Sequence, residues 1–91
     1  MLSTFWISIR FEQRLYRYHV TYILLNERIE QFIVKARNKT LIFHSNRPYL
    51  KSNPGLKRWS VNYKLVSGDI RNVYFKELIT QALDKVVNKY K

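Results

Sequence analysis

The sequence contains no cysteine, only two glycines and two prolines, and six acidic residues against 17 basic ones. Without cysteine, the chain cannot form a disulfide, a thiolate nucleophile or a cysteine-based zinc site. Because glycine occurs only at positions 55 and 68, a glycine-rich phosphate-binding loop is also excluded. The longest apolar run, residues 22–25, is too short to cross a bilayer, and the N-terminus carries no signal-peptide pattern. We therefore predict a cytoplasmic protein that does not bind membranes.

The 91 residues are enough for one domain and too few for two. Aromatic residues make up 15% of the chain, which is typical of a packed core and not of a disordered segment. We predict a single domain over residues 1–91. Residues 1–14 form either a strand or a loosely attached N-terminal extension, and residues 46–58, which hold both prolines, form a long basic loop.

Apolar and polar residues alternate in several stretches, which is the pattern of half-buried β-strands. The alternation predicts strands at residues 16–25, 29–36, 40–45 and 59–66, with a further candidate at residues 5–11. The connections between the strands from residue 16 to residue 45 are too short for a crossover. Neighbouring strands must therefore be antiparallel and form a meander.

Residues 73–90 show the clearest helical pattern, because apolar side chains recur along them at every third or fourth position. Asn72 is suited to cap the start of this helix. With strands first and a helix last, the sequence predicts an α+β fold, a four- or five-stranded antiparallel sheet with one C-terminal helix packed on one face. The side chains expected to point inward are Tyr18, Val20, Phe32, Val34, Leu41, Phe43, Val61, Tyr63, Leu78, Ala82, Leu83 and Val86.

One helix covers only one face of such a sheet. The opposite face would carry Ile23, Leu25, Ile33 and Ile42, which is more apolar surface than a monomer usually exposes. A symmetric homodimer would bury these side chains. Alternatively, the N-terminal segment would cover this face with its own apolar side chains.

Positive charge is concentrated in the middle of the chain. The formal net charge is +11, and residues 31–68 contain eight lysines and arginines and no acid. Such a segment gains free energy beside a polyanion. Cations mixed with aromatic rings suit single-stranded nucleic acid, because cations contact phosphates and rings stack on bases. We therefore predict a non-enzymatic, sequence-nonspecific nucleic-acid-binding protein. The alternative is a small interaction module that binds an acidic protein partner.

The predicted contact residues are the cations of this middle segment and the tyrosine beside Pro48. They are Lys35, Arg37, Lys39, Arg47, Tyr49, Lys51, Lys57, Arg58 and Lys64. Trp59 is either a second stacking ring or a core residue.

The chain offers little for catalysis or metal binding. His19 and His44 are the only histidines, and they would make a metal-free nuclease only if the fold brought them together beside a cation such as Arg47. The six acids lack the inward spacing of a metal site, so all six are predicted to be solvated surface groups. We predict no cofactor, no metal and no catalytic residue, and expect function to survive replacement of both histidines.

Overall fold

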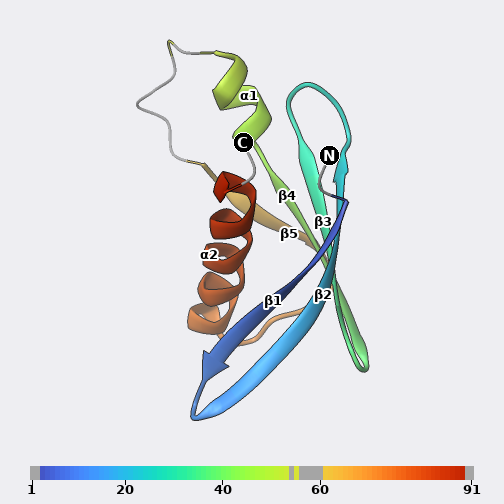
Figure 1. Ribbon diagram of the computed structural model, residues 1–91, viewed down its shortest axis with the longest axis vertical. Helices are drawn as coiled ribbons and strands as arrows, with labels where there is room; N and C mark the ends of the chain where they lie inside the picture. The colour runs from blue at the N-terminus through green and yellow to red at the C-terminus, as the bar shows by residue number, and fades with distance from the viewer. Residues whose placement is uncertain (1–2, 54, 56–60, 90–91) are drawn as a thin grey trace.

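The computed structural model describes residues 3–53, 55 and 61–89 of the chain. Its elements are β1 (Thr4–Phe11), β2 (Arg14–Leu24), β3 (Glu30–Ala36), β4 (Lys39–Ser45), α1 (Arg47–Ser52), β5 (Tyr63–Ser67) and α2 (Val73–Lys89). The strands form one antiparallel sheet in the order β1-β2-β3-β4-β5, and α2 lies against one face of this twisted sheet (Figure 1). The predicted α+β meander with one C-terminal helix on the sheet is thereby confirmed, with five strands.

The N-terminal segment forms an edge strand of the sheet. β1 pairs with β2 from end to end, and its side chains Ile7 and Ile9 are only 4% and 3% exposed. Both belong to the hydrophobic core on the side of α2. The segment is therefore an integral strand, and the alternative that it covers the opposite face of the sheet is wrong.

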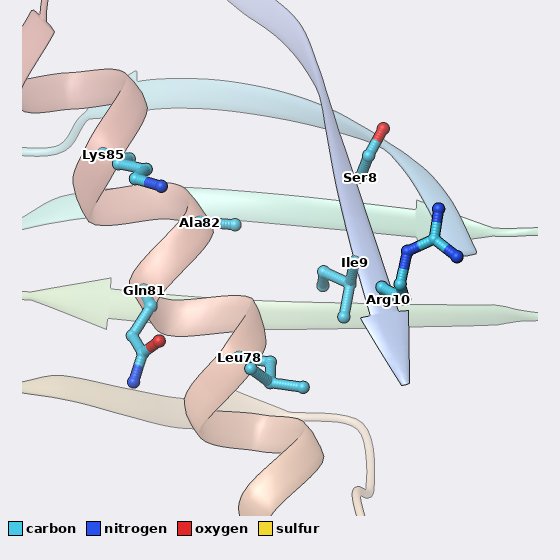
Figure 2. Close-up of a pocket in the computed structure, with 7 residues that line it drawn as sticks. All are labelled: Ser8, Ile9, Arg10, Leu78, Gln81, Ala82 and Lys85. Carbon is cyan, nitrogen blue, oxygen red and sulfur yellow. The ribbon is translucent and has the colours of Figure 1, made fainter. Parts of the chain in front are cut away.

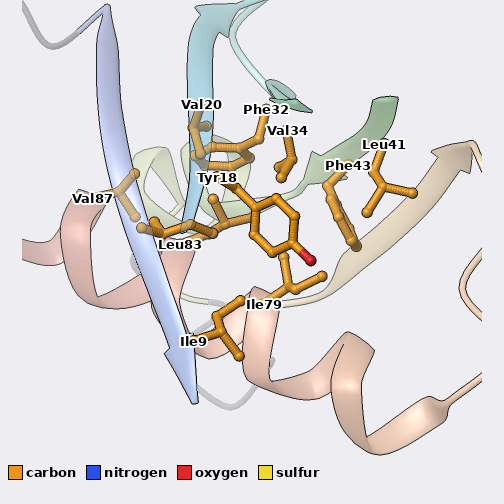
Figure 3. Packing of buried hydrophobic residues seen from close by; sticks show 11 residues of the cluster. Ile9, Tyr18, Val20, Phe32, Val34, Leu41, Phe43, Ile79, Leu83 and Val87 are labelled. Carbon is orange, nitrogen blue, oxygen red and sulfur yellow. The ribbon is translucent and has the colours of Figure 1, made fainter. Parts of the chain in front are cut away.

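The core lies between α2 and the face of the sheet that this helix covers (Figure 3). Its buried apolar side chains are Ile7, Ile9, Tyr18, Val20, Phe32, Val34, Leu41, Phe43, Ile79, Leu83 and Val87. The three residues from α2 are spaced four apart and so lie on one side of the helix. Every residue predicted to point inward is buried or half-buried except Val61, which is 39% exposed. Val61 is exposed because β5 begins only at Tyr63.

A short helix occupies part of the segment that was expected to be a loop. The prediction of a loop over residues 46–58 is wrong for α1, at residues 47–52. Pro48 lies in the first turn of α1, where its missing N–H costs no hydrogen bond. The helix ends at Asn53, whose side-chain amide donates a 2.7 Å hydrogen bond to the Tyr49 carbonyl oxygen. Residues 59 and 60 of the predicted fifth strand lie outside the described residues.

The connection from β5 to α2 depends on two residues. Gly68 has a φ of +93°, and a Cβ at this position would lie 2.7 Å from both Leu41 Cδ2 and the Thr40 carbonyl oxygen. Only glycine fits this conformation and this space. Asn72 then caps α2 as predicted, because its Oδ1 accepts a 3.0 Å hydrogen bond from the Phe75 backbone N–H.

The turn between β1 and β2 consists of two residues with positive φ. Glu12 and Gln13 have φ values of 49° and 65°, a geometry that Asn-Gly usually supplies. Neither residue favours this conformation. The hairpin therefore depends on the pairing of its strands and on the burial of Ile7 and Ile9.

Candidate nucleic-acid interface

The face of the sheet that points away from α2 is called the outer face. Side chains alternate along a strand, so residues between two core positions point to this face. Figure 2 shows the alternation on β1, where Ile9 points toward α2 while Ser8 and Arg10 point away from it. The alternation assigns to the outer face Thr4, Trp6, Ser8, Arg10, Leu15, Arg17, His19, Thr21, Ile23, Gln31, Ile33, Lys35, Thr40, Ile42, His44, Lys64 and Val66.

Positive charge is exposed on this outer face. Arg10, Arg17, Lys35 and Lys64 are all exposed there, and none of its residues in the described strands is acidic. Within the described part of the chain, the one ion pair joins Arg47 to Glu30, which is a core-side residue. The four outer-face cations are therefore not neutralised by any described neighbour.

Trp6 is the large exposed aromatic side chain of the outer face, at 58% exposure. The guanidinium carbon of Arg17 lies 5.2 Å from the centroid of its ring. The His19 ring meets the indole edge-on, with ring centroids 5.1 Å apart. These neighbours orient the indole and still leave it accessible. An accessible ring beside cations can stack on a nucleobase.

The strand register places a lysine beside this aromatic cluster and another across the sheet. Trp6 lies opposite His19 on β2, and His19 lies opposite Lys35 on β3. Lys64 lies on β5, opposite His44. Because neighbouring strands are about 4.8 Å apart, the cations from β1 to β5 span roughly 19 Å across the sheet. This span is long enough to contact several phosphates of one nucleic-acid strand.

Three further predicted contact residues lie at the margins. Arg37 and Lys39 are exposed at the turn between β3 and β4, where Ala36 pairs with Lys39. They extend the positive charge from Lys35 around this end of the sheet. Lys51 is exposed on α1, beyond the opposite end of β4.

Arg47, another predicted contact residue, is engaged inside the protein. Its Nε and Nη2 donate hydrogen bonds of 3.0 and 2.7 Å to the two carboxylate oxygens of Glu30. Glu30 is fully buried, so the prediction that all six acids are surface groups is wrong for this residue. The burial follows from position, because Glu30 lies on the same side of β3 as Phe32 and Val34. A buried carboxylate is tolerated when it is paired and hydrogen-bonded in this way.

Two hydroxyl groups complete this buried ion pair. Tyr22 donates a 2.8 Å hydrogen bond to Glu30 Oε1, and Ser45 Oγ accepts a 3.1 Å hydrogen bond from the Arg47 backbone N–H. Burial and the hydrogen bond to Glu30 raise the pKa of Tyr22 to about 12. The hydrogen bonds to Glu30 likewise raise the pKa of Arg47. The network thus fixes the start of α1 to the sheet and keeps Arg47 from acting as a free cation.

Tyr49, the predicted stacking residue, also has a partner within the protein. Its ring is half-buried on α1, and the guanidinium carbon of Arg28 lies 5.6 Å from the ring centroid. Tyr49 is therefore less accessible for stacking than Trp6. Lys57, Arg58 and Trp59 lie outside the described residues.

The two histidines do not form a pair. His19 lies opposite Lys35 and His44 lies opposite Gln31, and these two β3 positions are about 13 Å apart at roughly 3.3 Å per residue. Instead, His44 Nε2 is 2.9 Å from Gln31 Oε1. An acid–base pair must act on the same reacting atoms, which this separation does not permit. Among the described residues, no three His, Asp or Glu side chains are grouped so as to hold a metal ion.

The sequence prediction of contact residues did not include Trp6, Arg10 and Arg17, which the structure places on the outer face. The prediction concentrated on the acid-free middle of the chain, and these residues come before it. The signal was present, because alternation over residues 5–11 and 16–25 puts them opposite the core positions.

Comparison with known proteins adds no assignment to this geometry. The chain matches no protein-family model, no curated protein and no solved structure. Within the described ranges, no helix has the length and apolar character needed to span a membrane.

Proposed function

We propose that the protein binds single-stranded nucleic acid through its outer face, without strong sequence preference and without catalysis. The observation that carries this proposal is the acid-free outer face, where four exposed cations accompany an exposed Trp6. The cations contact phosphates, and the indole stacks on a base. Arg37 and Lys39 extend the contact at one end of the sheet.

The exposed Trp6 ring favours a single strand, because unpaired bases are free to stack on it whereas the bases of a duplex are stacked on one another. Reading base edges in a duplex requires an element that enters a groove, usually a helix. In this protein, α2 packs its apolar side against the core, and its polar side carries both acids and lysines. Phosphate contact and stacking are therefore expected to supply most of the affinity.

The test is the binding of labelled single-stranded DNA and RNA, with a duplex for comparison, measured by fluorescence anisotropy in a salt series. If four to six cations engage phosphates, log affinity for single strands falls with log salt at a slope of roughly −3 to −4. Replacing Arg17, Lys35 and Lys64 together by Gln is expected to lower the size of that slope by about 2.

Two further variants locate the interface. The triple variant Lys76→Gln, Lys85→Gln, Lys89→Gln removes the same charge from α2 and is expected to keep the original slope. The triple variant Lys51→Gln, Lys57→Gln, Arg58→Gln tests the basic segment after β4 and is expected to weaken binding to all sequences about equally. No measurable binding at about 50 mM salt, or equal losses in the α2 and outer-face variants, would contradict the proposal. An acidic protein partner would then be the better account.

A further inference from the structure

A second surface feature lies at the other side of the sheet, near the start of α2. A groove of about 480 Å³ is lined by residues from the end of β1, the first part of β2, the start of β4, the connection from β5 to α2 and the first turn of α2. Its volume falls within the range of about 300–1,000 Å³ that is usual for small-molecule sites. Of the residues that line this groove, only Lys39 also belongs to the proposed nucleic-acid interface.

One wall of the groove is aromatic. Phe11, Tyr16 and Phe75 come from three different elements, and all three are half-buried. The ring centroid of Phe75 lies 5.0 Å from that of Phe11 and 5.3 Å from that of Tyr16. A half-buried aromatic wall of this kind suits a flat ring such as a nucleobase.

Two cations line the same groove. Lys39 and Arg71 are both exposed there, and neither forms an ion pair with a described residue. Asp69 is the single acid among the lining residues, so the groove keeps a net positive charge. Aromatic surface beside unpaired cations matches a ligand that has a planar base and an anionic group.

We propose that this groove binds one nucleotide, with its base against the aromatic wall and its phosphate between Lys39 and Arg71. The nucleotide is either a free mononucleotide or a residue at the end of a bound strand. The strand-end case rests on the proposed nucleic-acid function, whereas binding of a free mononucleotide does not.

The test is a titration of the ¹⁵N-labelled full chain with AMP, followed by NMR. Saturable shifts are expected at the amides of Lys39 and of residues 69–75. Adenosine lacks the phosphate and ribose 5-phosphate lacks the base, so each is expected to bind more weakly than AMP. Ribose 5-phosphate with the affinity of AMP would exclude the aromatic wall, and adenosine with that affinity would exclude the cations.

Charge variants at exposed positions test the phosphate half without disturbing the core. The double variant Lys39→Gln, Arg71→Gln is expected to weaken AMP binding about tenfold and to leave adenosine binding unchanged. Asp69→Asn removes a repulsive charge and is expected to strengthen AMP binding by about two- to threefold. Lys89→Gln is the control for net charge and is expected to have no effect. Equal AMP affinity in the double variant and the parent would overturn the proposal.

Competition separates the two sources of the nucleotide. If AMP at saturating concentration displaces a labelled single strand, the groove holds a residue of that strand. If AMP binds and the strand is unaffected, the groove takes free nucleotide. If single strands do not bind at all but AMP still gives the expected shifts, the proposed function fails and the groove assignment stands. Absence of saturable AMP shifts in the groove overturns the assignment whatever the strands do.

Discussion

The two faces of the sheet differ in their charged groups: the buried ones on the inner face are paired, and those on the outer face are exposed cations. On the inner face, the Glu30 carboxylate is buried and bound by Arg47 and Tyr22, and the Asp84 carboxylate of α2 accepts a 3.0 Å hydrogen bond from Tyr63. On the outer face, cations from four strands are exposed, and none of the described residues of this face is acidic. Alternation along the same strands produces both faces.

This difference separates structural charges from available ones. A buried charge on the inner face must be paired, because burial of an isolated ion would cost more free energy than a small fold has to spare. Arg47 is therefore engaged in the ion pair with Glu30, which stabilises the fold. The outer cations are solvated and have no such role, so they are the ones that an external polyanion can reach.

The outer face also has an apolar part. Its burial in a homodimer therefore stays a prediction. Ile23 is 41% exposed on this face, and Ile33 and Ile42 are half-buried beside it. Leu25, which was also predicted for this face, follows the end of β2 and is 45% exposed. A dimer through this face would bring together two chains of net charge +11 each. Such a contact is expected to need salt or a bound polyanion to offset the repulsion.

The largest expected effect is the loss of the inner ion pair. Glu30→Ala leaves Arg47 partly buried without its partner, and breaking a buried pair in this way costs about 3–5 kcal/mol. We expect the free energy of unfolding to fall by that amount, measured by chemical denaturation at neutral pH.

The double variant Glu30→Leu, Arg47→Met removes both charges and is the matched control. It is expected to recover most of the lost stability, because apolar side chains of similar size can replace a buried pair at little cost. If the double variant is as unstable as Glu30→Ala, the inner face depends on the shape of these residues and not on pairing of their charges.

An intermediate effect is expected at Trp6, and it concerns binding rather than folding. Trp6→Ala is expected to weaken binding to single strands by about 1–3 kcal/mol and to leave duplex binding unchanged. The free energy of unfolding is expected to change by no more than about 0.5 kcal/mol, because the side chain is mostly exposed.

Leu15→Ala is the control for Trp6→Ala. Leu15 lies on the same face and is 57% exposed, so its removal takes away apolar surface without removing a π face. Equal losses in the two variants would show that the outer face binds through general apolar contact instead of base stacking.

The strands and the C-terminal helix could be predicted because the residues that form the core recur in the sequence at regular spacings. Apolar residues at every second position mark the strands, and the three- and four-residue spacing marks α2. α1 was missed because it has no buried residue to give such a pattern. The Glu12–Gln13 turn could not be predicted from its residues, because it contains neither Asn nor Gly and its conformation is imposed by the pairing of β1 with β2.

The candidate site was only partly predictable. Lys35 and Lys64 were identified from charge alone, and the structure puts them on the outer face. Arg47 has the same charge but a buried partner 17 positions away in sequence, which composition cannot reveal. Trp6 has no charge to attract notice, and its exposure depends on β1 being an edge strand with its core side under α2.

The smallest expected effect is the dependence of stability on alkaline pH, which reports on the inner face alone. Burial and the hydrogen bond to Glu30 raise the pKa of Tyr22 to about 12, and burial beside the Asp84 carboxylate raises the pKa of Tyr63. Folding therefore favours the neutral phenols. The contribution of Tyr22 is complete below about pH 10, where an unfolded tyrosine is still protonated, and it is lost as the pH rises from about 10 to about 12. For Tyr63, whose pKa is raised more strongly, the loss continues above that range.

Chemical denaturation over that pH range tests this expectation with two Tyr→Phe variants. The parent is expected to lose stability between about pH 10 and pH 12, and Tyr22→Phe is expected to lose less because it has no phenol to ionise there. Tyr74→Phe is the control, since Tyr74 is 60% exposed and its hydroxyl makes no hydrogen bond to a described residue. Parallel curves for the parent and Tyr22→Phe would mean that the Tyr22 hydroxyl is open to solvent and that the Glu30 network is less closed than its geometry indicates.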